Sequence, residues 1–269
     1  MRLLTYMQSV SFGLLFFTTI TLGANWSNTE LQIQTGGELS VPGGGESTAH
    51  ILTFQHASAW DYGDNFFFVD HTRWSGGPGD ETSEFYGEWY SHFSLGAISG
   101  KKLGLGPVKD IGIVAGINLA PEVDSSWWLP GVRLSLDLDG FTFAQVDITA
   151  YLHQGGGNTD AEQFTIVDEE SSYMIDFSWA YPFKLGDLNW SIEGHLEYIN
   201  GREQVNNFQK IDLSSWLLFQ PQLRLDVGDL LIGKHEQLFF GVEYQYWKHK
   251  LGTKNQDDNA LQLLLVWRF

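Results

Sequence analysis

The sequence lacks cysteine, has few basic residues, and has only one long apolar run, at its N-terminus. Without cysteine there is no disulfide framework and no thiolate metal site. Lys and Arg total 15 against 33 Asp and Glu, and the net charge of -18 argues against nucleic acid as a partner, because phosphate binding needs a basic surface. No later segment approaches the ~20 apolar residues that a spanning helix requires. A helical membrane protein is therefore excluded.

The N-terminus has the features of a secretory signal. Arg2 precedes an apolar run from Val10 to Leu22, and Leu22-Gly23-Ala24 is a plausible cleavage site before Asn25. The run is too short for a membrane anchor. We therefore predict a signal peptide over residues 1–24 and an exported chain. Residues 25–269 show no linker or composition break, which predicts a single domain.

Aromatic residues and glycine are abundant: there are 19 Phe, 11 Trp, 10 Tyr and 30 Gly. The last segment alternates, and its apolar row is Leu261, Leu263, Leu265, Trp267 and Phe269. Period two predicts a strand with one apolar face. This ending resembles the C-terminal strand through which barrel-assembly machinery recognises bacterial outer-membrane barrels. The alternative is an edge strand of a soluble β-sandwich or a lipocalin-like carrier.

The same alternation recurs along the chain, for example over Thr142–Gln154 and Leu238–Trp247. Each segment matches the roughly 9–11 residues of a tilted transmembrane strand. Long polar connections are expected at Gly36–Ser47, Ser75–Ser83, Ala120–Pro130, Gly155–Ser171, Asn200–Ser214 and Lys250–Asp258. Short turns alternate with them. The pattern predicts an all-β fold: a transmembrane antiparallel up-and-down β-barrel of about twelve strands in the bacterial outer membrane.

A barrel of this size is intermediate between a filled barrel of about eight strands and an open porin of 16–18. A solute would therefore touch the wall, and inward side chains would set selectivity. The candidate lumenal residues are Phe66, Phe68, Asp70, Trp74, Glu88, Tyr90, Asp147, Glu193, Glu197, Arg224 and Glu243. A further basic residue, either Arg133 or Arg73, is expected to face the lumen with them.

Acids predominate among these candidates, so neutral polar or cationic solutes would be favoured over anions. The rings could stack on a flat base, an interaction worth roughly 1–3 kcal/mol in single-strand binders. The alternative for the rings is barrel packing, and the alternative for the acids is a structural ion pair or hydrogen bond.

Several segments resemble one family of channels. They are Leu52–Gln55, Asn65–Asp70, Glu88–Ser94, Leu103–Asp110 and Val266–Phe269. They resemble the nucleoside-specific channel-forming outer-membrane proteins, the Tsx and OmpK group, best over Thr48–Leu119. Thr53 and Gln55 stand where relatives carry acidic residues. The resemblance implies a twelve-stranded barrel that admits nucleosides by passive diffusion and, in some members, serves as a phage receptor.

Two other functions remain open. One is a structural or receptor-type barrel without an open pore, and the other is a lipid-processing barrel enzyme. The enzyme would need a serine nucleophile and a histidine base such as His56 or His71, but no diagnostic motif is present. We predict no catalytic residue, no metal and no cofactor. The expected partners are outer-membrane lipid and lipopolysaccharide, the assembly machinery, a nucleoside and a phage.

Overall fold

A computed structural model describes residues 24–41, 45–77, 80, 82–155 and 164–269. Residues 1–23 of the predicted signal peptide lie outside this part of the chain, so the signal peptide stays a prediction. Within the described residues, no helix is long and apolar enough to cross a membrane.

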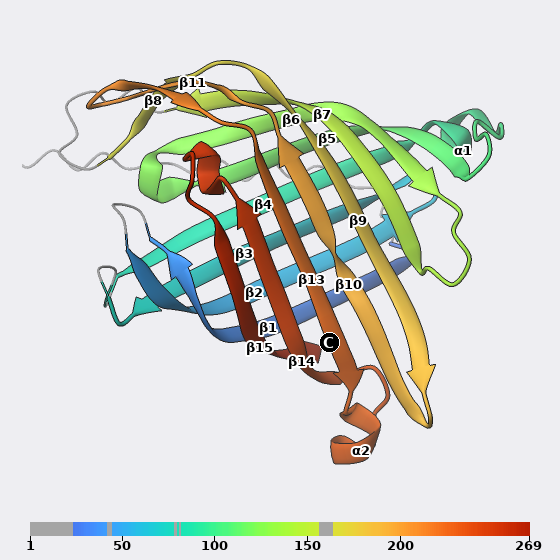
Figure 1. The fold of residues 1–269 in the computed structure, drawn as a ribbon. Coiled ribbons are helices and arrows are strands. Elements are labelled where there is room, and N and C mark those ends of the chain that lie inside the picture. The colour runs from blue at the N-terminus through green and yellow to red at the C-terminus, as the bar shows by residue number, and fades with distance from the viewer. Residues whose placement is uncertain (1–23, 42–44, 78–79, 81, 156–163) are drawn as a thin grey trace, which may run out of the picture.

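The described chain forms a closed antiparallel barrel of twelve strands (Figure 1). Each strand pairs with its neighbours in the sequence order, and the first pairs with the last. The predicted up-and-down transmembrane barrel is confirmed. Its strands are β1 (Trp26–Ser40), β2 (Glu46–Trp60), β3 (Gly63–Ser75), β4 (Ser83–Ser94), β5 (Val108–Ala120), β6 (Ser125–Leu136), β7 (Phe143–Gly155), β9 (Ser172–Leu185), β10 (Leu188–Ile199), β13 (Trp216–Asp226), β14 (Leu238–Lys248) and β15 (Asp258–Arg268).

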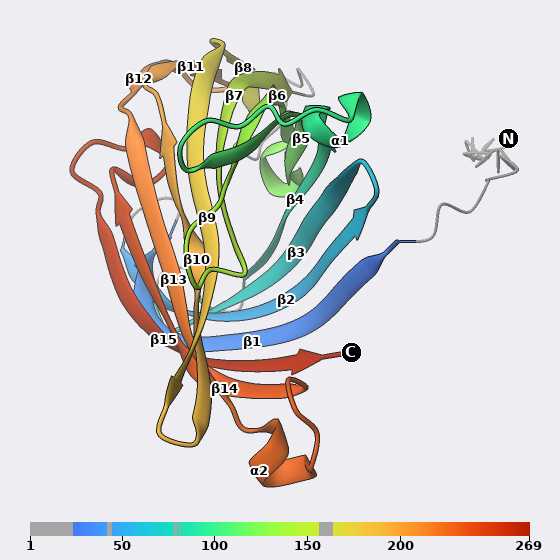
Figure 2. The same cartoon turned by 90° about the vertical axis from the view of Figure 1, so that its right-hand side faces the viewer.

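The two ends of the barrel differ. At one end, which we call the short-turn end (Figure 2), lie Trp26, Phe269 and the connections with the helices α1 (Leu95–Ser99) and α2 (Gly228–Ile232). At the other, the long-loop end, a separate sheet contains β8 (Ile166–Glu169), β11 (Arg202–Asn206) and β12 (Lys210–Leu213). Figure 1 shows this sheet and the two helices at opposite ends. The 3-10 turns η1 (Pro121–Val123) and η2 (Lys250–Gly252) also lie at the long-loop end.

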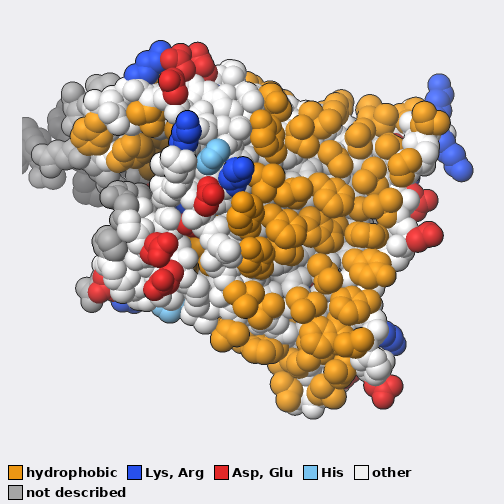
Figure 3. Space-filling model, viewed as in Figure 1, with side chains coloured by type: hydrophobic (Ala, Val, Ile, Leu, Met, Phe, Trp, Pro, Cys, Tyr) orange, Lys and Arg blue, Asp and Glu red, His pale blue; other side chains and the backbone are white. Residues whose placement is uncertain are grey.

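The barrel is inside out relative to a soluble protein. In β15, Leu261, Leu263 and Leu265 are exposed on the outer face, whereas Gln262 between them is completely buried. Side chains alternate across a strand, so the apolar row of each strand joins an outer belt. Figure 3 shows this belt as a broad hydrophobic surface over the strands. A belt of this kind requires lipid around it.

Pro221 lies inside β13, where a proline removes one hydrogen-bond donor of the ladder. Its partner across the β10–β13 pair is Gly194, and the β13–β14 register omits positions 220 and 221. A Cβ on Gly194 would lie 2.8 Å from the Pro221 Cα and 2.4 Å from the Gln220 carbonyl oxygen. Glycine opposite proline therefore accommodates the irregularity within a closed wall.

The connections follow the predicted alternation of length, but two expected loops are partly strand. β1 continues to Ser40, with a register shift between Thr35 and Glu38, and β6 begins at Ser125. The glycines in the first segment weakened the strand pattern there, although Gly36 and Gly37 adopt positive φ within the shifted strand. The loops over Gly155–Ser171 and Asn200–Ser214 contain the sheet of β8, β11 and β12, which was not predicted.

A charge at the centre of the outer belt should destabilise the barrel. Leu263→Arg places a cation midway along β15, and we expect a loss of about 2–4 kcal/mol in the free energy of unfolding. The measurement is equilibrium denaturation in phospholipid vesicles. The control, Asn259→Arg, lies near the long-loop end of the same exposed row, where about 0–1 kcal/mol is expected. Equal losses at both positions would contradict insertion in this orientation.

Candidate functional site in the barrel lumen

The structure places every predicted lumenal residue on the inward face of its strand. Asp70 pairs with Thr53, Glu88 with Phe68, and Glu243 with Gln222, all on the face opposite the outer belt. Arg133 is inward and buried, whereas Arg73 is exposed on the outer face, so Arg133 is the correct one of the two. Whether these residues contact a solute stays a prediction.

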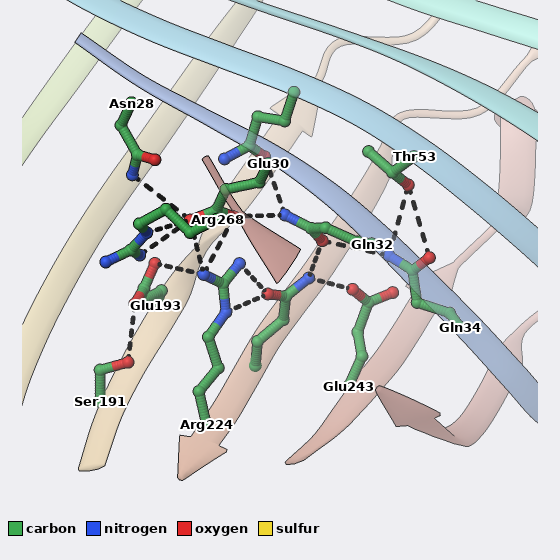
Figure 4. Close-up of polar contacts among 12 residues, drawn as sticks. Asn28, Glu30, Gln32, Gln34, Thr53, Ser191, Glu193, Arg224, Glu243 and Arg268 are labelled. Atoms are coloured by element: carbon green, nitrogen blue, oxygen red, sulfur yellow. Dashed lines mark hydrogen bonds and ion pairs between the residues drawn. The ribbon is translucent and has the colours of Figure 1, made fainter. Parts of the chain in front are cut away.

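A first charge network joins β1 and β15, the first and last strands of the barrel, to β13 (Figure 4). Arg224 contacts Glu30 at 3.2 Å and Glu193 at 3.1 Å. Arg268 lies 2.8 Å from the same Glu30 carboxylate. Nε of Arg224 also donates to the side-chain oxygen of Gln222 at 2.7 Å. Both arginines therefore have their charge compensated by fixed acids.

Glu30, which is 1% exposed, is a lumenal residue that the sequence candidates do not include. The signal was present: Asn28, Glu30, Gln32 and Gln34 alternate with Leu31 and Ile33. Gln34 and Gln32 donate along this row, and Gln32 donates to Glu30 at 2.9 Å. The row extends the network along the inner face of β1.

A second network lies across the lumen wall, on β3, β4, β6 and β7. Arg133 binds Asp147 through two parallel hydrogen bonds of 2.7 Å and Asp64 through a third of 2.8 Å. Asp64 also lies 2.7 Å from Nδ1 of His92. The bidentate geometry is the strong form of an arginine–carboxylate pair. Asp147, a predicted lumenal residue, is thus held in a structural ion pair.

Other inward carboxylates have neutral hydrogen-bond partners. Thr53 donates to Asp70 at 2.6 Å, Tyr86 donates to Glu88 at 2.6 Å, and Gln220 donates to Glu243 at 2.7 Å. Within the described residues, Asp70, Glu88, Glu197 and Glu243 form no ion pair with lysine or arginine.

These uncompensated carboxylates lie near one another. Glu88 is close enough to Glu197 and Asp176 for electrostatic repulsion, and Asp70 is likewise near Glu88 and Glu243. His195 also lies near Glu88, and its Nδ1 lies 3.3 Å from Asp176. The middle of the lumen therefore holds several neighbouring carboxyl groups and few basic side chains.

The predicted aromatic residues divide into two groups. Phe66 and Phe68 are half-buried, with ring centroids 6.1 Å apart, and Phe68 lies 6.1 Å from Tyr86. This ring surface lies beside the uncompensated carboxylates. Trp74 packs in a small apolar cluster with Leu39 and Ala260. Tyr90 is buried in a larger apolar cluster with Val114 and Leu129, and Phe66 packs against that cluster. Tyr90 and Trp74 therefore match the packing alternative, and Phe66 matches it in part.

The sheet at the long-loop end buries charged side chains against the barrel mouth. Arg202 of β11 lies over the rings of Tyr151, at 4.7 Å, and Trp216, at 4.5 Å. It pairs with Glu169 of β8, which also accepts a 2.8 Å hydrogen bond from Trp127. Because Tyr151, Trp216 and Trp127 point inward from barrel strands, this contact fastens the sheet onto the barrel mouth.

His56 and His71, the candidate bases for lipid chemistry, lie on the outer face. Within the described part of the chain, neither forms a hydrogen bond with a serine hydroxyl. His56 lies 2.8 Å from the Thr29 hydroxyl, and the His71 ring packs at 4.6 Å on Phe85. Ser125 Oγ lies 3.0 Å from Nε2 of His153 and 3.2 Å from the Val123 carbonyl oxygen, so its single hydroxyl hydrogen has two acceptors within reach.

Comparison with known proteins gives no family assignment. No protein-family model matches the chain, and no curated protein matches it. Among solved structures, the KdgM porin is 9% identical, with coverage of 90% of this chain and 99% of the porin and a TM-score of 0.44. A bacterial polysaccharide outer membrane secretin is 9% identical, with coverage of 92% and 99% and a TM-score of 0.45. The β domain of the Bordetella autotransporter BrkA is 10% identical, with coverage of 90% and 98% and a TM-score of 0.39. These similarities are too low to argue for a solute or a role.

The Arg133–Asp147 pair should be a stability element of the lumen. The two side chains are 3% and 5% exposed, so Arg133→Leu should lower the free energy of unfolding by about 3–5 kcal/mol, because it leaves a buried carboxylate unpaired. The double variant Arg133→Leu/Asp147→Leu should recover part of this loss. Denaturation of the wild type, Arg133→Leu, Asp147→Leu and the double variant in lipid vesicles tests the coupling. Additive losses from the two substitutions would show that the pair is not energetically coupled.

Proposed function

We propose that the protein is an outer-membrane channel for passive, selective diffusion of small polar solutes, with a preference for neutral or cationic molecules over anions. The observation that carries the proposal is the group of inward carboxylates, Asp70, Glu88, Glu197 and Glu243, that have no arginine or lysine partner among the described residues. A fixed negative field in a low-dielectric wall raises the local concentration of cations and excludes anions.

Nucleosides are the solutes that we infer for this channel. The resemblance of Leu103–Asp110 and neighbouring segments to the nucleoside-specific channels supports this choice. The adjacent rings of Phe66, Phe68 and Tyr86 support it physically, because a nucleobase has a flat face that stacks on aromatic side chains. The hydroxyls of the sugar could hydrogen-bond with the carboxylates. A surface role toward phage or lipopolysaccharide belongs to the same proposal only as an extension of the family resemblance.

Removal of an uncompensated carboxylate should change solute flux. Asp70→Ala and Glu88→Ala each delete a wall contact; a contact worth about 1 kcal/mol corresponds to about a fivefold change in partitioning. Ile148→Ala, on the outer face of β7, is the control and should leave flux unchanged. Liposome swelling with uridine and with a neutral sugar measures the effect. Equal flux through all three variants would refute a selective role for the carboxylates.

Nucleosides should also block ionic current through single channels. Phe68→Ala should weaken this block by roughly 1–3 kcal/mol of stacking energy, which corresponds to a loss of about fivefold or more in blocking affinity. Planar-bilayer recording with uridine and adenosine tests this, with ribose as the control because it has no base to stack. Current that is insensitive to nucleosides would remove them as the substrate while leaving cation preference to be judged from the reversal potential.

A receptor-type barrel without an open pore is the second candidate function. One observation favours it: the sheet of β8, β11 and β12 is fastened at the barrel mouth through Arg202, Glu169 and Trp127. Conductance distinguishes the two functions. A folded wild-type protein without conductance, together with conductance in an Arg202→Ala variant, would show that this sheet closes the barrel.

A further inference from the structure

Two helical connections at the short-turn end hold large apolar side chains outside the barrel wall. In α2, Leu230 is 65% exposed and Leu231 is 70% exposed. In the connection that contains α1, Ile98 is 54% exposed and Leu105 is 87% exposed. Isolated exposed leucines are ordinary on a protein surface, but adjacent ones on short rigid turns mark a contact surface.

Both connections are held in place by an aspartate at a strand end. Asp226 accepts hydrogen bonds of 2.9 Å from the backbone N–H groups of Gly228 and Glu236, on the two sides of α2. Asp110 accepts from the Gly96 backbone at 3.0 Å and from the Ser94 hydroxyl, at the start of α1. The apolar side chains are therefore presented by ordered turns.

The exposed leucines continue the lipid-facing belt. α2 follows β13 directly and precedes β14, whose Phe240 is exposed on the belt. Figure 3 shows hydrophobic side chains continuing from the strands to the end of the molecule where α2 lies in Figure 1. α1 and α2 lie on opposite flanks of the barrel in both ribbon views.

Lysines accompany both apolar turns. Lys101 and Lys102 follow α1 and are exposed, and Lys234 follows α2 and is exposed. Exposed lysine beside aliphatic side chains suits the headgroup region of a bilayer, where the aliphatic groups enter the acyl boundary and the ammonium groups meet phosphate. A water-soluble protein partner would leave this continuity with the belt unexplained.

We propose that α1 and α2 are interfacial membrane anchors. Their apolar residues dock on the phospholipid leaflet at the short-turn end. The partner is the lipid surface itself, with a phosphate-rich headgroup region. Contacts on opposite flanks would restrain the tilt of the barrel relative to the membrane plane. This inference depends on the barrel spanning the bilayer and is independent of what passes through the lumen.

The absence of cysteine permits a direct test, because one introduced cysteine gives one labelling site. Nitroxide labels are placed at Leu231→Cys and Leu105→Cys in the full chain, folded into vesicles of phosphatidylethanolamine and phosphatidylglycerol. Collision rates with oxygen and with a water-soluble nickel complex then report depth. We expect an oxygen-to-nickel ratio several-fold higher at both positions than at Asp139→Cys, an exposed position in the β6–β7 turn.

Two further variants calibrate the measurement. Phe240→Cys gives the ratio within the belt, and Asp229→Cys gives the ratio for the polar side of α2. A ratio at Leu231 or Leu105 equal to that at Asp139 would overturn the proposal for that turn. Spin–spin broadening at either position would instead assign the surface to a second copy of the chain and would also overturn it. Correct folding of each variant is checked by the heat-dependent shift in its electrophoretic mobility.

Discussion

The pairing of the first strand with the last is the constraint on which the rest of the structure depends. Hydrocarbon offers no water to backbone N–H and C=O groups, so a sheet in a membrane must have no free edge. β1 and β15 meet this requirement by pairing from Glu30 with Arg268 to Thr35 with Leu263, and the Phe269 backbone N–H donates to the Thr29 carbonyl at 2.9 Å. The same closure brings Glu30 between Arg268 and Arg224. The closure of the wall therefore also completes this lumenal charge network.

Period-two alternation predicted the strands and their faces because lipid imposes a strict outside, as Leu261, Leu263 and Leu265 illustrate. It could not predict which inward groups meet. Asp64 and Arg133 are 69 residues apart in sequence, and their contact depends on the tilt and closure of the whole barrel. The sheet of β8, β11 and β12 was missed because its short strands are enclosed in polar loops. Arg202 looks like a solvated loop residue until Tyr151 and Trp216 enclose it.

The inward acids divide into those that bind arginine and those that have only neutral hydrogen-bond donors. Basic residues are scarce, and the inward arginines Arg133, Arg224 and Arg268 all bind specific carboxylates. Such pairs resist exchange, because removal of either partner leaves a buried charge. Asp70, Glu88 and Glu243 have threonine, tyrosine and glutamine donors instead. Neutral donors orient a carboxylate without cancelling its charge.

This difference determines what the middle of the lumen can do. A carboxylate bound to arginine has its charge neutralised, so a passing cation would have to compete with a fixed partner. A carboxyl group oriented by the hydroxyl of Thr53 or Tyr86 has no such cationic partner, and the hydroxyl occupies only one of its acceptor positions. Conduction requires binding that is favourable enough to admit a solute and weak enough to release it. The ion pairs of Arg133, Arg224 and Arg268 lie nearer the short-turn ends of their strands and hold those strands together, whereas Asp70 and Glu88, beside Phe68, have only neutral donors.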